Sequence, residues 1–258
     1  MKQSSFTAKE LFAMAYLMKK QKMYGIPDAM GTERNAVLQA VLDGLVSQGI
    51  ANMDIDGHIT VLPEYFATVN TICDCQKCLT INVRRSDVKE QSFIFWAIDG
   101  VWVMSEIVED RYVFSQTDAD MIRAITMGLI NIGEVRILTQ QAVVPQLDIV
   151  KAKRACAKGN HIEANRIIRQ CGVDPKTSNV ITAGLCGSTY YLGLVYMDMC
   201  TGACEKQDMS FIYNDGVLLA LDQTVANLRT CATFTPISDD DLRSRVDSLL
   251  SSFLEKGA

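Results

Sequence analysis

The most constraining feature of the sequence is a stretch at residues 92–104 that predicts a β-hairpin with two apolar faces. Ser92–Ile98 is followed by Asp99-Gly100, a dipeptide favoured in two-residue turns, and then by Val101–Met104. Successive side chains of a strand point to opposite faces. Each face is apolar: Phe93, Phe95 and Ala97 lie on one, and Ile94, Trp96 and Ile98 on the other. Both faces must therefore be covered, either as a buried central hairpin or with one face left as a Met- and aromatic-lined groove for a helical partner.

A second predicted hairpin, at residues 210–221, resembles the first in sequence. Ser210–Asn214, Asp215-Gly216 and Val217–Leu221 repeat the strand, Asp-Gly turn and strand, with Ser-Phe-Ile at the start of both. The likeness favours an internal duplication, and a chance match of two common hairpins is the alternative. We predict two halves, residues 1–135 and 136–258, each with helices, a strand, a hairpin and a capped helix.

The N-terminal segment 1–78 is winged-helix-like in its predicted order of elements. Thr7 and Glu10 form a capping box that begins a first helix. A second helix runs from Thr32 to about Gln48, a small Asp-Gly hairpin covers 50–62, and a third helix runs from Glu64 to about Cys78. The half is completed by strands at 79–83 and 112–114 and by a helix capped at Thr117 with Asp120 three residues later.

The second half predicts a similar succession. A helical region, Val144–Gln170, is broken at Gly159, and strands follow at Val180–Cys186 and Thr189–Met197. A last helix begins with a capping box of Ser238 and Asp241. The expected fold class is α+β, with a central, mainly antiparallel sheet flanked by helices and a quasi-twofold repeat of the two halves.

Composition narrows the class of protein but shows no chemistry. Of the 258 residues, 48% are hydrophobic and 21% charged, which excludes wholesale disorder. A net charge of −5 argues against a nucleic-acid or anionic-membrane partner. No apolar run reaches the roughly 18–20 residues that cross a bilayer, and Met1–Ser5 leads into no export signal. We therefore expect a cytoplasmic protein whose nine cysteines are reduced thiols.

The polar motifs favour neither catalysis nor a metal. Cys73, Cys75 and Cys78 could bind zinc with a fourth ligand from Cys200 or Cys204, but paired C-x-x-C knuckles are absent. His58 and His161 are the only histidines and are isolated in the sequence. Asp239–Asp241 is explained by the first turn of a helix. We predict no catalytic residues, no metal ligands and no cofactor, with a metal- or small-molecule-binding enzyme as the remaining alternative.

A winged-helix transcriptional regulator is another alternative. Its recognition helix would be Thr32–Gln48, which must present cations to DNA but offers only Arg34 against Glu33 and Asp43. The remaining basic spots, Arg84-Arg85 and Lys151–Arg154, are expected beside a sheet and on a solvated helix face. The sequence therefore favours protein binding over DNA binding.

The order of elements resembles the EspG family of ESX (type VII) secretion-associated proteins and their relatives in Gram-positive bacteria. The stretches that carry the resemblance are Ser5–Leu11 leading into the first helix and Leu45–Ile50 before the small hairpin. In the second half they are Tyr191–Tyr196, the Asn214–Val217 turn and the terminal helix. The resemblance spans most of the chain and is one of pattern.

The resemblance implies a non-catalytic, cytosolic, chaperone-like factor that binds a helical secreted protein, with neither nucleic acid nor membrane as partner. Whether the chain forms a homo-oligomer stays open. We expect recognition by two polar loops beside hairpins, Val108–Arg111 and Met199–Asp208, for which the sequence shows no packing role. The candidate partner-binding residues are Glu109, Asp110, Arg111, Met199, Thr201, Glu205 and Lys206.

Overall fold

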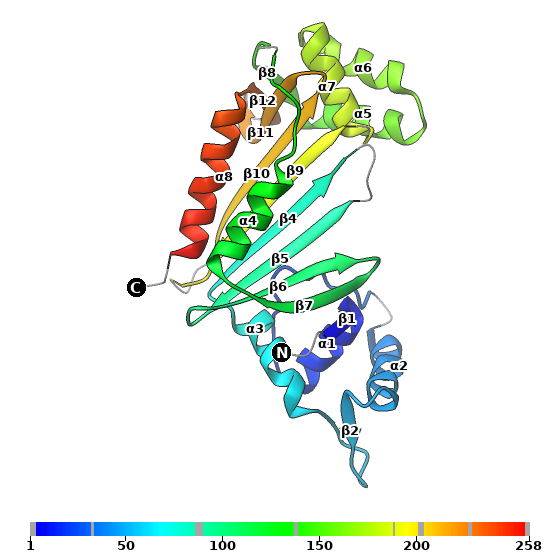
Figure 1. The fold of residues 1–258 in the computed structure, drawn as a ribbon. Coiled ribbons are helices and arrows are strands. Elements are labelled where there is room, and N and C mark those ends of the chain that lie inside the picture. Colours follow the sequence, from blue (N-terminus) through cyan, green and yellow to red (C-terminus); the bar gives the residue numbers. More distant parts are fainter. Residues whose placement is uncertain are drawn as a thin grey trace.

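The centre of the molecule is a long ten-stranded sheet with antiparallel neighbours (Figure 1). The structure, a computed structural model, describes residues 4–31, 34–85, 90–136, 139–187, 189–200, 204–226 and 229–255. Across the sheet the strands follow the order β1 (Ser4–Thr7), β7 (Arg111–Thr117), β6 (Val101–Val108), β5 (Gln91–Ile98), β4 (Lys77–Arg84), β9 (Tyr190–Asp198), β10 (Glu205–Asn214), β11 (Val217–Ala226), β12 (Arg229–Pro236) and β8 (Ala142–Pro145).

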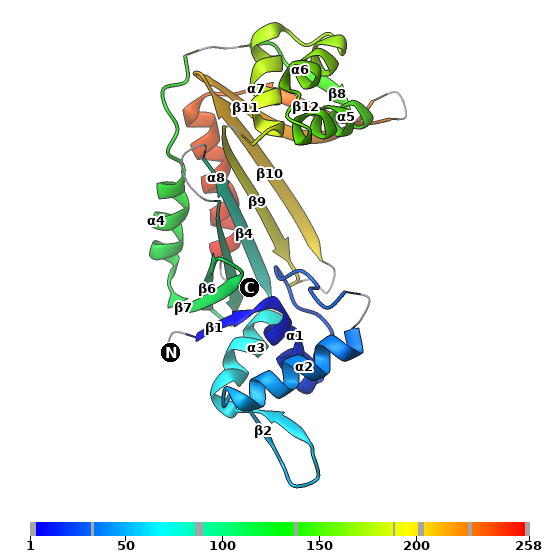
Figure 2. The same cartoon turned by 90° about the vertical axis from the view of Figure 1, so that its right-hand side faces the viewer.

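Helices cover both faces of this sheet. A separate two-stranded hairpin, β2 (Ala51–Met53) and β3 (Ile59–Val61), projects from the N-terminal helices and is followed by a short 3-10 turn, Pro63–Tyr65 (Figure 2). The helices of the described residues are α1 (Ala8–Leu17), α2 (Arg34–Ser47), α3 (Phe66–Asp74), α4 (Ala119–Leu129), α5 (Gln146–Ala157), α6 (His161–Gln170), α7 (Pro175–Leu185) and α8 (Asp239–Leu254).

The two halves of the chain follow the same order of elements. Each has one edge strand (β1 or β8), three helices (α1–α3 or α5–α7), four consecutive strands (β4–β7 or β9–β12) and one last helix (α4 or α8). The halves meet where β4 pairs with β9 in the middle of the sheet. The structure thus has the α+β class, the antiparallel sheet and the repeated plan expected from the sequence, while the boundary at residues 135–136 stays a prediction.

The alternation of side chains along β9 shows which helices share a face. Leu192, Leu194 and Tyr196 belong to the core cluster that also contains residues of α4 and α8. The intervening positions point the other way. There Tyr191 packs with the cluster of α5–α7, and Met197 packs with the cluster of α1–α3. The two groups of three helices therefore cover opposite ends of one face, and α4 and α8 cover the other face (Figure 2).

The hairpin β5–β6 is buried on both faces, as one of the two sequence interpretations predicts. Phe95 is fully buried in the cluster with α4 and α8. On the other face Trp96 is fully buried, stacks on Phe114 with ring centroids 5.6 Å apart, and donates its indole N–H to Tyr24 O at 2.8 Å. Elements of the same chain, rather than a partner, thus cover both sides of this hairpin.

Several predicted element ends are confirmed, and one predicted strand is wrong. The capping boxes at Thr7 and Ser238 are present. Val180–Cys186, expected to be a strand, lies mostly in α7, which begins with Asp174 as N-cap and Pro175 in its first turn. This Asp-Pro start signal and the burial of positions 177, 180, 181 and 184 at helical spacing explain the difference.

Other element boundaries also differ from the predictions. The predicted helix Glu64–Cys78 ends at Asp74, because Lys77 begins a strand that pairs with both β5 and β9. The helix α4 is capped by Asp118 rather than by Thr117. Strands β1 and β12 were not predicted, and Val144, expected to be helical, lies in β8. The predicted start of the second helix at Thr32 lies outside the described residues. The described part of α2 begins at Arg34.

Truncating a side chain beside the β4–β9 pairing should destabilise the whole sheet. Ile81 is fully buried and opposes Leu194, so we expect Ile81→Ala to lower the free energy of unfolding by about 3–4 kcal/mol. The matched control is Ile55→Ala, because Ile55 is fully exposed and should change stability by less than about 0.5 kcal/mol. Denaturant unfolding followed by circular dichroism measures both. Equal effects of the two variants would contradict this view of the core.

Candidate partner-binding groove

No helix of the described residues covers the middle of one sheet face (Figure 2). This region lies between α1–α3 at one end and α5–α7 at the other, over strands β4, β9, β10 and β11 (Figure 2). A cavity of about 470 Å³ opens here, which we call the central groove. Its lining residues are Asn82, Tyr191, Gly193, Leu194, Val195, Lys206, Asp208, Ser210, Leu221, Asp222 and Gln223.

The floor of the central groove combines polar side chains with the apolar Val195 and Leu221. Asn82 Oδ1 accepts a hydrogen bond of 2.7 Å from the hydroxyl of Ser92, and the hydroxyls of Tyr191 and Ser210 lie 3.2 Å apart. A Cβ added at Gly193 would lie 2.6 Å from the hydroxyl oxygen of Tyr191, so this ring lies across the glycine. The absence of a side chain there lets the tyrosine lie flat, and the floor offers hydroxyl and amide groups at its surface.

One ion pair borders the central groove. Lys206 Nζ lies 2.9 Å from Asp208 Oδ2, and both side chains are more than half exposed. An exposed pair of this kind adds little to stability, about 0–1 kcal/mol. It leaves an exposed cation and an exposed anion on β10, where a partner's polar groups can reach them.

A second cavity continues the central groove beneath α5 and α7. It shares Tyr191, Leu221 and Gln223 with the central groove and has a volume of about 410 Å³. We call it the α5–α7 pocket. Its other lining residues are Arg84, Gln146, Ile149, Lys153, Ile181, Gly184, Leu185, Ile212, Ala232 and Phe234.

A disulfide joins the two helices that form one wall of this pocket. Cys156 in α5 is bonded to Cys186 at the C-terminal end of α7. The expectation that all nine cysteines are reduced is therefore wrong for this pair. No pattern in the sequence indicates this bond, because the two cysteines are 30 residues apart and meet only when α5, α6 and α7 pack together.

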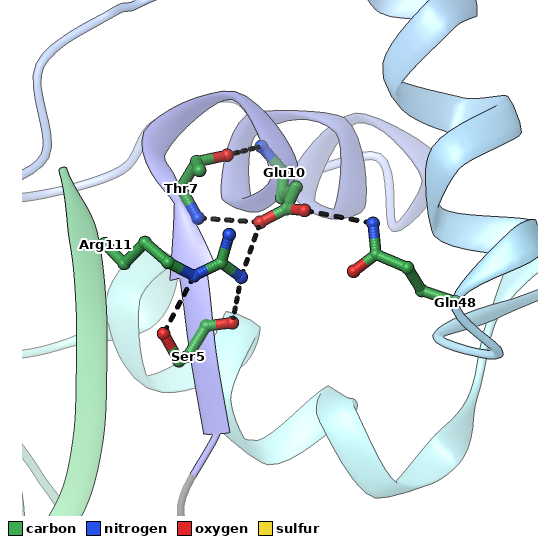
Figure 3. A network of polar contacts seen from close by, with 5 residues as sticks. All are labelled: Ser5, Thr7, Glu10, Gln48 and Arg111. Carbon is green, nitrogen blue, oxygen red and sulfur yellow. Dashed lines mark hydrogen bonds and ion pairs between the residues drawn. The ribbon is translucent and has the colours of Figure 1, made fainter.

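Arg111 belongs to the structure of the N-terminal region, and Figure 3 shows its contacts. Its Nε donates to Ser5 Oγ at 3.0 Å, and its Nη2 donates to Ser5 O at 2.7 Å. Nη2 also lies 3.3 Å from Glu10, whose carboxylate accepts from the backbone N–H of Thr7 and from the side chain of Gln48. Arg111 thus connects β7 to the start of α1, a packing role that the sequence did not show.

The other predicted loop residues lie in different parts of the structure. Glu109 and Asp110 form the exposed turn between β6 and β7, away from the lining of both cavities. Of the predicted loop Met199–Asp208, Glu205–Asp208 lie in β10 and pair with β9. Thr201 lies outside the described residues. A partner-binding role for all of these residues stays a prediction.

Two residues of the predicted loop Met199–Asp208 have defined surroundings in the structure. Met199 packs against the cluster of α1–α3, and its N–H donates to Gln76 O at 2.8 Å. Among the described residues predicted to bind a partner, Lys206 is the one that lines the central groove. The sequence analysis did not identify the other residues that line the central groove. Polar Thr80, Asn82 and Arg84 nevertheless alternate with apolar residues in β4, and this pattern indicates an uncovered face.

Three of the cysteines considered for zinc, Cys73, Cys75 and Cys78, are buried, and the absence of a metal there stays a prediction. Burial raises the pKa of Cys73 to about 11 and that of Cys75 to about 12, and it raises the pKa of Cys78 as well. Among the described residues, the group whose ligand atoms could surround an ion is Asp54, Asp56 and His58. All three are exposed, and Asp54 already accepts hydrogen bonds within its own turn.

The arrangement of a long antiparallel sheet with paired helical groups defines an EspG-like fold. The chain is similar over its whole length to the Mycobacterium tuberculosis type VII secretion system chaperone EspG5, whose structure was solved in complex with the PE25–PPE41 dimer. The match has a TM-score of 0.55 and 12% sequence identity and covers 100% of this chain and 98% of the other. The resemblance found in the sequence is thus confirmed at the level of the fold.

Comparisons based on sequence gave no further relatives. No model of a protein family matches the chain, and no curated protein matches it. Within the described part of the chain, the helices are too short or too polar to cross a membrane.

Removing the disulfide should destabilise the protein. A bond across 30 residues contributes about 3.5 kcal/mol when it restricts the unfolded chain, so we expect Cys156→Ser with Cys186→Ser to lower the free energy of unfolding by about this amount. Chemical denaturation with and without a phosphine reductant measures it. Cys204→Ser, at an exposed free cysteine, is the control. A double variant as stable as the unreduced protein would contradict the bond's contribution.

Alkylation should distinguish the buried thiols from the exposed ones. With a pKa of about 11, Cys73 has only about 10⁻³ of its molecules as thiolate at pH 8, so we expect iodoacetamide to modify exposed Cys204 first. While the protein stays folded, the rate at Cys73 should rise about tenfold for each unit by which the pH is increased, up to its pKa. Peptide mapping by mass spectrometry measures the rates. Rapid labelling of Cys73 at pH 8 would show that it is neither buried nor raised in pKa.

Proposed function

We propose that this protein is a non-catalytic, chaperone-like accessory factor that binds an α-helical protein secreted by a type VII system. The observation that carries this proposal is the similarity of fold, over the full length of both chains, to EspG5, a chaperone captured with its PE25–PPE41 dimer. The open central groove supports it, because the groove gives this fold a surface on which a partner can dock.

The dimensions of the groove suit a helix. Its floor spans four neighbouring strands, β4, β9, β10 and β11. Strands lie about 4.8 Å apart, so the floor is about 14 Å wide. An α-helix with its side chains is about 10–12 Å across. A single helix or the tip of a helical hairpin therefore fits the floor, within reach of the ion pair of Lys206 and Asp208 on β10.

The placement of the charged residues supports a protein partner rather than a nucleic acid. Arg34, the one arginine expected on a DNA-recognition helix, lies over the ring of Phe12, 4.6 Å from its centroid. Arg111 is engaged with Ser5 and Glu10. Such contacts occupy cations that would otherwise meet phosphates.

We further place the protein in the cytosol, where a secretion substrate is available before export. Glutathione keeps most cytosolic thiols reduced. In that compartment the bond between Cys156 and Cys186 would depend on local oxidation, and thiol trapping during cell lysis reads its state directly.

Blocking the central groove should abolish capture of the client. We expect Ser210→Arg to place a long cation over the floor of the groove and to lower recovery of a helical secreted protein at least tenfold. The measurement is affinity capture from the native host's lysate, with mass spectrometry and a nucleic-acid stain on the eluate.

The matched control is Ser244→Arg, the same substitution at an exposed position of α8 beneath the other face of the sheet. It should capture the client as the unmodified protein does. Equal recovery by the two variants would place the client elsewhere. Enrichment of DNA that falls with added salt would replace the proposal with a nucleic-acid role.

A further inference from the structure

The α5–α7 pocket combines apolar walls with cations. The side chains of Ile149 and Ile181 on the helices face those of Ile212 and Phe234 on the sheet across it. Its volume of about 410 Å³ lies within the range of sites that hold small molecules. No aspartate or glutamate is among the described residues that line it.

Arg84 is the half-buried cation of the pocket. Its Nη2 donates to Gly184 O at 2.8 Å, and its guanidinium lies 5.6 Å from the centroid of the Tyr191 ring. These contacts fix the side chain between β4 and the end of α7. Its Nε is buried and has no hydrogen-bond partner in the described part of the chain. A buried donor without an acceptor is unfavourable, so this atom favours a ligand that brings an acceptor.

Lys153 is the second cation. It projects from α5 at the exposed side of the pocket and forms no ion pair with the described residues. Its neighbour Lys151, by contrast, is paired with Asp148 at 2.7 Å. The described lining of the pocket thus has a half-buried guanidinium, an exposed ammonium and no carboxylate. A guanidinium binds a carboxylate through charge-assisted hydrogen bonds, and the apolar walls bind the group that carries the carboxylate.

We propose that the α5–α7 pocket binds a carboxylate attached to a short apolar group, with Arg84 and Lys153 as the partners of the anion. The carboxylate can belong to a free organic acid or to an acidic residue of a polypeptide in the central groove. The second source rests on the proposed function, and the first does not.

The test titrates the full chain with 3-phenylpropionate and, as the matched uncharged probe, with 3-phenylpropan-1-ol. Protein NMR shifts or calorimetry give the two affinities. We expect the acid to bind at least about tenfold more tightly than the alcohol, because a charge-assisted hydrogen bond discriminates by this much or more. Equal binding of the two probes, or none by the acid, would overturn the proposal.

Two variants assign the cations. Lys153→Met keeps the aliphatic stem and removes the charge, and it should weaken binding of the acid about threefold to tenfold without affecting the alcohol. Arg84→Lys keeps a charge but removes Nε, and it should weaken the acid further. Lys158→Met, at the end of the same helix outside the pocket, is the control for Lys153. Thermal melting shows whether each variant is folded. Unchanged affinity in both folded pocket variants would contradict the assignment.

A peptide pair distinguishes the two sources. The peptides acetyl-Leu-Glu-Leu-amide and acetyl-Leu-Gln-Leu-amide differ only in the carboxylate. Preference for the glutamate peptide supports an acidic polypeptide as the source, whereas binding of 3-phenylpropionate alone supports a free acid. Binding of the acid with an empty client capture would retain the pocket and reject the chaperone role, so the two proposals fail separately.

Discussion

The antiparallel pairing of β4 with β9 is the interaction on which the rest of the structure depends. It joins two five-stranded halves into one sheet through a register that runs from Lys77 opposite Asp198 to Arg84 opposite Tyr191. Alternate side chains of both strands fill the core under α4 and α8. On the other face, the middle positions of both strands line the central groove, and Cys78 and Met197 pack against α1–α3. A slip of the pairing register by one residue would exchange these two sets. The register that buries the apolar side chains on one face therefore also determines which side chains the opposite face presents.

Local signals in the sequence predicted the elements best. The Asp-Gly turns at positions 99 and 215 both have positive φ at the aspartate and the glycine, as the hairpins require. The capping residues Thr7 and Ser238 likewise act within one helical turn. Residues 180–186 misled the prediction because an apolar run is compatible with a strand or a buried helix, and the Asp-Pro signal lies before the run.

The candidate site could not be predicted in the same way, because its residues come together only through pairing of distant strands. Asn82 and Ser210 are far apart in the chain and meet across β9. The bond between Cys156 and Cys186 depends equally on how three helices pack. Periodicity in β4 could have indicated an uncovered face, but it could not show which strands extend that face or that helices leave it open.

The placement of the helices has a consequence for the orientation of a partner in the central groove. The backbone plan repeats in the two halves, yet the ends of the central groove differ in chemistry. One end has Met197 and Met199 beside α1–α3, with Lys206 paired to Asp208. The other end, beneath α5 and α7, has Arg84 and Lys153, which form no ion pair with the described residues. A partner lying along the groove would therefore bind in one orientation, with its acidic end toward α5 and α7, so an almost symmetric scaffold can read a polypeptide with polarity.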